Sequence, residues 1–130
     1  EHESEFLDWH GFKSYPRPVQ KPTLPVHIGG NKGKAFERIA KYGAGWYAPT
    51  GDPEELKPQL DEMAEECRKI GRDPAEIEVT AMWPMKGGLD LVKQMEDLGV
   101  HRLNVPTLAV APTDQDSLIK KLGDEIIAKL

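Results

Sequence analysis

Cysteine is nearly absent from this chain, which has only Cys67 among its 130 residues. A single cysteine excludes an internal disulfide and fits a reducing compartment, so we expect a cytoplasmic protein. No apolar run approaches the roughly 18 residues that a membrane-spanning helix requires. The chain also lacks a basic stripe, and its net charge is −5. We therefore expect neither a membrane nor nucleic acid as a partner.

Metal-ligand clusters and catalytic carboxylate pairs are missing as well. The four histidines share no spacing typical of metal ligands, so we expect no metal site. We interpret His27, which falls within an expected strand, as a buried and hydrogen-bonded side chain rather than a catalytic base. Trp46, Trp83 and Cys67 are interpreted as core residues. The catalytic residues therefore remain unknown from the sequence.

The first 24 residues differ in composition from the rest of the chain. They contain four aromatic residues followed by closely spaced prolines: Phe6, Trp9, Phe12, Tyr15, Pro16, Pro18 and Pro22, with Pro25 next. Prolines at this density disfavour a helix and favour an extended chain. We interpret residues 1–24 as an extended arm that packs across another surface through its aromatic side chains, and not as an independent domain.

From Pro25 onward, patterns typical of strands alternate with patterns typical of helices. The expected strands are 25–29, 45–49, 77–83 and 100–105, and the expected helices are 33–43, 53–70, 88–98 and 114–129. This order predicts a parallel sheet with right-handed crossovers. Asp52 and Pro53 are typical of a helix start, and Glu55 gives it a box-like pattern. Thr113 with Asp116 predicts a similar cap for the last helix.

The turn Gly29-Gly30-Asn31 lies between the first expected strand and the first expected helix. A strand, a glycine turn and a helix start direct backbone N–H groups and the positive end of a helix dipole at one point. Such a point suits a phosphate. The alternative is a tight turn whose glycines serve only the backbone conformation.

Two architectures fit this order of elements. A small open-sheet nucleotide-binding domain would need G-x-G-x-x-G after the first strand and an acid after the second, and the chain has neither. A (β/α)8 barrel needs about 250 residues, so four βα units make about half of one. Half a barrel leaves two open edges and an uncovered apolar face. We therefore expect an upstream half or a homo-oligomer that closes the sheet.

Three segments resemble the C-terminal half of the luciferase-like monooxygenases, which depend on flavin or on coenzyme F420. They are 16–22 (PRPVQKP), 25–31 (PVHIGGN) and 38–46 (RIAKYGAGW), and the later segment 71–74 and the strand 77–80 also match. The resemblance implies a TIM barrel whose fifth to eighth strands are those of residues 25–130. It further implies FMN or F420 as cofactor, a small-molecule substrate, and a cofactor phosphate held by Gly29, Gly30, Asn31 and Lys32.

The chain departs from the family pattern after the glycines, where a small or hydroxyl-bearing residue is usual and Asn31-Lys32 stands instead. The first four strands of such a barrel, which supply most ring contacts, are absent. We therefore expect the C-terminal part of a luciferase-like oxidoreductase that is inactive by itself. The alternative is a standalone half barrel that self-associates without catalytic activity.

Overall fold

Four parallel strands form the centre of the fold. The computed structural model describes residues 2–13, 15–21, 23–84 and 86–130. The strands are β3 (His27–Gly29), β4 (Gly45–Ala48), β5 (Glu78–Met82) and β6 (Arg102–Asn104), paired in that order. A strand order that follows the chain without reversal has no switch point, which distinguishes it from a doubly wound nucleotide-binding sheet.

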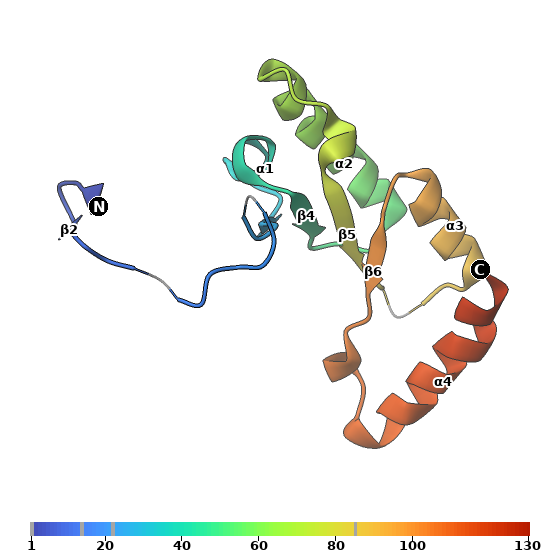
Figure 1. Cartoon of the computed structure of the whole chain (residues 1–130). Helices are drawn as coiled ribbons and strands as arrows, with labels where there is room; N and C mark the ends of the chain where they lie inside the picture. Colours follow the sequence, from blue (N-terminus) through green and yellow to red (C-terminus); the bar gives the residue numbers. More distant parts are fainter. Residues whose placement is uncertain (1, 14, 22, 85) are drawn as a thin grey trace.

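Helices connect the strands and follow the last one. They are α1 (Ala35–Tyr42), α2 (Pro53–Lys69), α3 (Leu89–Asp97) and α4 (Gln115–Glu125). Figure 1 follows this succession from the blue N-terminal segment through the sheet to α4 in red. Each of these strands and helices lies inside the range that the sequence predicts, so the βαβαβαβα order is confirmed.

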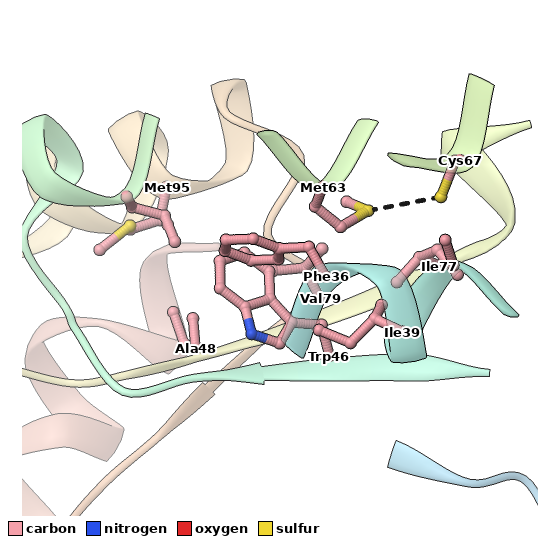
Figure 2. Close-up of a cluster of buried hydrophobic side chains, with 12 residues drawn as sticks. Phe36, Ile39, Trp46, Ala48, Met63, Cys67, Ile77, Val79 and Met95 are labelled. Carbon is pink, nitrogen blue, oxygen red and sulfur yellow. Dashed lines mark hydrogen bonds between the residues drawn. The ribbon is translucent and has the colours of Figure 1, made fainter. Parts of the chain in front are cut away.

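The hydrophobic core lies between the helices and one face of the sheet. Alternate strand residues point into it, as the two-residue period of a strand requires. Figure 2 shows the strand residues beneath side chains of α1, α2 and α3. The cluster includes Phe36, Ile39, Trp46, Ala48, Leu56, Met63, Cys67, Ile77, Val79, Ala81 and Met95. Trp46 and Cys67 are therefore core residues as predicted, and Trp83 is also buried.

The opposite face of the sheet is polar, and the prediction of an uncovered apolar face is wrong. Its side chains pair with one another: Arg102 Nη1 lies 2.7 Å from Glu78 Oε1, and Asn104 Nδ2 donates to the Tyr47 hydroxyl at 3.0 Å. The prediction that His27 is buried is also wrong. Its ring lies against Gly45 of the neighbouring strand, but β3 is an edge strand and nothing described covers the ring.

The N-terminal segment runs away from the sheet and helices (Figure 1). It contains two short antiparallel strands, β1 (His2–Glu3) and β2 (Asp8–Trp9), and no helix within its described residues. The Trp9 and Phe12 rings stack at 4.9 Å between centroids. The aromatic side chains are exposed, so they do not pack across the described part of this chain. Pro22 lies outside the described residues, and the boundary between residues 24 and 25 stays a prediction.

Local capping agrees with the sequence at α2 and differs at α4. Asp52 Oδ1 accepts a hydrogen bond from the Glu54 N–H at 2.9 Å. The Thr50 hydroxyl donates to Glu55 Oε2 and accepts a hydrogen bond from the Asp52 N–H, so the predicted box closes through Thr50. At α4 the predicted Thr113 cap is wrong. A 3₁₀ turn, Pro112–Asp114, precedes the helix and places Asp114 at the N-cap without a side-chain capping bond.

Candidate functional site

The carboxyl ends of the four strands lie along one edge of the sheet because all four strands are parallel. In a barrel of βα units this edge carries the ligand site, built from the loops that follow the strands. Here the loop after β3 holds Gly30 and Asn31, and the loop after β4 holds Thr50 and Gly51. The predicted phosphate turn is therefore at the edge where a ligand is expected.

The turn after β3 brings the four predicted site residues together. Gly30 and Gly33 have φ of +97° and +60°, in the left-handed region that favours glycine. Helix α1 then begins at Ala35, and its N-cap, Lys34, makes no capping bond through its side chain. The backbone N–H groups of residues 31–34 donate to no acceptor among the described residues. Four successive free donors thus precede the positive end of an eight-residue helix.

The surroundings of the turn leave room for a ligand. A Cβ atom at Gly29 or at Gly33 would meet no heavy atom within 4 Å. Lys32 and Lys34 are exposed beside the turn, and Asn31 is half-buried. Open space, free N–H donors and two cationic side chains fit a phosphate group, and none of these residues supplies a negative charge that would repel it.

Two features of this edge were missed by sequence reasoning. The Trp46 indole Nε1–H donates to the Gly30 carbonyl at 2.9 Å, so a residue assigned only to the core also contacts the turn. Tyr47 reaches Asn104 across β5 on the polar face. Both contacts depend on strand register, which no local pattern reports.

The one cysteine lies away from this edge. Cys67 is fully buried in α2, with its Sγ 3.8 Å from Met63 Sδ. Burial raises the pKa of the Cys67 thiol, which disfavours the reactive thiolate. The interpretation of Cys67 as an inert core residue therefore agrees with its surroundings.

Other features found in the described part of the chain are few. No group of three His, Cys, Asp or Glu side chains there is placed to hold a metal ion. None of the helices in those residues has the length and apolar character needed to cross a membrane. An apolar groove of about 460 Å³ lies between β6, α3 and α4, on residues that include Trp83, Met95 and Leu103. It does not include the glycine turn.

The comparison with protein families gives the affiliation. The model of the luciferase-like monooxygenases matches residues 1–86, which include the N-terminal segment, the glycine turn and strands β3, β4 and β5. The chain belongs to the luciferase-like monooxygenase family. The resemblance predicted from the sequence is thereby confirmed. No curated protein matches this luciferase-like chain.

Two solved structures are similar to this chain, and the first of them shares its fold. The coenzyme F420-dependent tetrahydromethanopterin reductase from Methanopyrus kandleri matches with a TM-score of 0.75 at 13% identity, over 99% of this chain and 57% of the reductase. A long-chain alkane monooxygenase matches with a TM-score of 0.46 at 19% identity, over 75% of this chain and 23% of that enzyme. The predicted fold class, about half of a (β/α)8 barrel, is confirmed. This luciferase-like chain spans 57% of the length of the reductase.

Proposed function

We propose that this chain is the C-terminal part of a flavin- or F420-dependent oxidoreductase, and that its glycine turn binds the cofactor phosphate. The observation that carries the proposal is the set of free backbone N–H groups at residues 31–34, at the carboxyl end of β3. Gly29, Gly30, Asn31 and Lys32 form this site. Its place within the segment that matches the family model supports the assignment.

Electrostatics favour an anion at this turn. Four N–H dipoles, the start of α1 and the Lys32 and Lys34 ammonium groups all present positive potential to one region. Lysines on flexible stems hold a phosphate as point charges, while backbone donors fix its position. The turn therefore holds the tail of the cofactor, and its ring is left free to extend along the carboxyl edge of the sheet.

FMN and F420 share the chemistry that this site recognises, a phosphate linked to a redox-active ring system. The bound ring supplies hydride transfer, with a small molecule as the other partner. The residues of this chain bind and orient the cofactor. The single cysteine leads us to expect that the protein works in the cytoplasm.

The test is a titration of FMN and of F420 into the full-length protein that carries this chain, followed by fluorescence. We expect saturable binding of one of the two. Gly30→Ala should weaken that binding about tenfold, because an L-residue at φ of +97° is strained and the turn must change shape.

Gly71→Ala is the matched control for this variant. Gly71 also has a positive φ, +72°, but it follows α2 at the opposite end of the fold from the turn. Gly71→Ala should lower the free energy of unfolding about as much as Gly30→Ala does, and it should leave the affinity for the cofactor unchanged. Equal effects of the two substitutions on affinity would argue against the glycine turn as the phosphate site.

A second candidate is a half barrel that self-associates and catalyses nothing. The observation that favours it is the pair of open edges: among the described residues, β3 and β6 each pair with one strand only. Unpaired strand edges promote pairing with another chain. Sedimentation of the purified chain tests it. A concentration-dependent oligomer that binds neither FMN nor F420 supports this candidate over the first, and a stable monomer contradicts it.

A further inference from the structure

A fully buried tryptophan is hydrogen-bonded to the glycine turn. The Trp46 Nε1–H donates to the carbonyl oxygen of Gly30 at 2.9 Å, between residues 16 positions apart in the chain. Trp46 is 0% exposed, and its ring packs edge-on against Phe36 of α1, with centroids 5.3 Å apart. Figure 2 shows the indole among the core side chains. The carbonyl of Gly30 is thus drawn toward the helix side of the sheet.

Peptide planarity transmits this constraint to Asn31. The Gly30 carbonyl and the Asn31 N–H belong to the same peptide unit, and in a trans peptide they point in opposite directions. Because Trp46 holds the carbonyl toward the core, the Asn31 N–H must point away from it. That N–H is the first of the four donors that have no partner among the described residues.

We infer that Trp46 is a positioning residue for the phosphate site, because its indole N–H fixes the Gly30–Asn31 peptide with the Asn31 N–H directed at the ligand. This inference rests on the proposed function of the turn. Gly30 has no Cβ atom, so its backbone can adopt several conformations besides the one observed, in which φ is +97°. The Gly30–Asn31 peptide could therefore rotate. The bond from a rigid, buried ring removes that freedom before the ligand arrives, which reduces the entropic cost of binding.

Trp83 offers the comparison within the same fold. Trp83 is also buried, with 5% of its surface exposed. It comes directly after β5, whereas Trp46 lies within β4. Its indole N–H makes no hydrogen bond to any described residue, whereas that of Trp46 is satisfied by a turn carbonyl. Trp46 and Trp83 thus share burial and ring size and differ in contact with the turn.

The experiment compares ligands with and without phosphate. Trp46→Phe keeps an aromatic ring in the core and removes the N–H donor, and Trp83→Phe is the matched control. Both are made in the full-length protein and titrated with FMN and with riboflavin. If the protein binds F420 instead, F420 and its deazaflavin chromophore without the phosphate-linked tail take their place.

We expect Trp46→Phe to weaken binding of the phosphate-bearing ligand about tenfold and that of the phosphate-free ligand less than twofold. Trp83→Phe should change the ratio of the two affinities less than twofold. An equal loss for both ligands in Trp46→Phe, or no loss for either, would overturn the positioning role. Failure of the folded wild-type protein to bind any of these ligands would overturn the proposed function, and the positioning role with it.

A second variant keeps the inference testable if Trp46→Phe does not fold. Asn31→Pro removes the N–H itself from the loop after β3 and should also weaken phosphate-bearing ligands selectively. Where both variants fold, the double variant should lose little more affinity than either single one, because Trp46 acts through the Asn31 N–H. Additive losses would show that the two residues act independently and would contradict the inference.

Discussion

At the scale of single residues, Gly51 has no space for a side chain. A Cβ there would lie 1.9 Å from the Met82 carbonyl oxygen, because the β4–α2 loop folds closely over β5. Gly51→Ala should therefore lower the free energy of unfolding by about 1–3 kcal/mol. Chemical denaturation of the wild-type protein and the variant measures this difference in the free energy of unfolding.

Gly123→Ala is the control for that prediction. Gly123 lies within α4 with no atom within 4 Å of a built Cβ, so alanine should stabilise the helix by about 0.5–1 kcal/mol. If both substitutions changed the free energy of unfolding in the same direction, the predicted difference between Gly51 and Gly123 would be wrong.

Cys67 gives the protein a predictable dependence on alkaline pH. Burial raises the pKa of the folded thiol above its ordinary value of 9.0, so the folded state holds the proton more tightly than the unfolded chain. The resulting stabilisation is fully present below about pH 9 and is lost as the pH rises through the folded-state pKa. Cys67→Ala should show a shallower fall in the free energy of unfolding over this range. Parallel curves for the two proteins would count against this account.

At the scale of elements, the start of α2 is stabilised by a side-chain cap and that of α4 is not. Asp52 accepts a hydrogen bond from the Glu54 N–H, whereas Asp114 makes no capping bond. Asp52→Ala should lower the free energy of unfolding by about 1 kcal/mol. Asp114→Ala should cost less than half of that in the same denaturation experiment. A larger loss from Asp114→Ala would reverse the assignment of the caps.

Local signals were enough to predict the helices and strands. Asp52, Pro53 and the apolar stripe through Leu56, Met63 and Cys67 all lie within a few turns of one another, so α2 could be read from its own residues. The Thr113 cap failed because Pro112 initiates a 3₁₀ turn that shifts the helix start. Where the helix begins depends on both Thr113, which favours a cap, and Pro112, which favours a 3₁₀ turn, and neither residue decides it alone.

Features that depend on pairing between strands could not be predicted from the sequence pattern. The polarity of the uncovered face, the exposure of His27 and the Tyr47–Asn104 contact follow from register and from which strand lies at an edge. The glycine turn could be located from sequence because it is contiguous. Its contact with Trp46 could not, because it joins β4 to the loop after β3.

At the scale of the whole molecule, the chain is an arc of a barrel. Its helices cover one face of the sheet, and the other face carries polar side chains and ends at two open edges. In a barrel of βα units, ligands lie at the carboxyl ends of the strands, beside the loops that follow them. This chain corresponds to about half of such a barrel, so the proposed activity requires site walls that these residues do not supply.

A titration of FMN and F420 into the full-length protein, with riboflavin as the phosphate-free comparison, tests the proposed phosphate site directly. We expect saturable binding of one cofactor, and weaker binding once its phosphate-bearing tail is removed, because the proposed site directs at that phosphate the N–H groups of residues 31–34, which have no acceptor among the described residues. A folded protein that binds neither cofactor, or binds equally well without the phosphate, would contradict it.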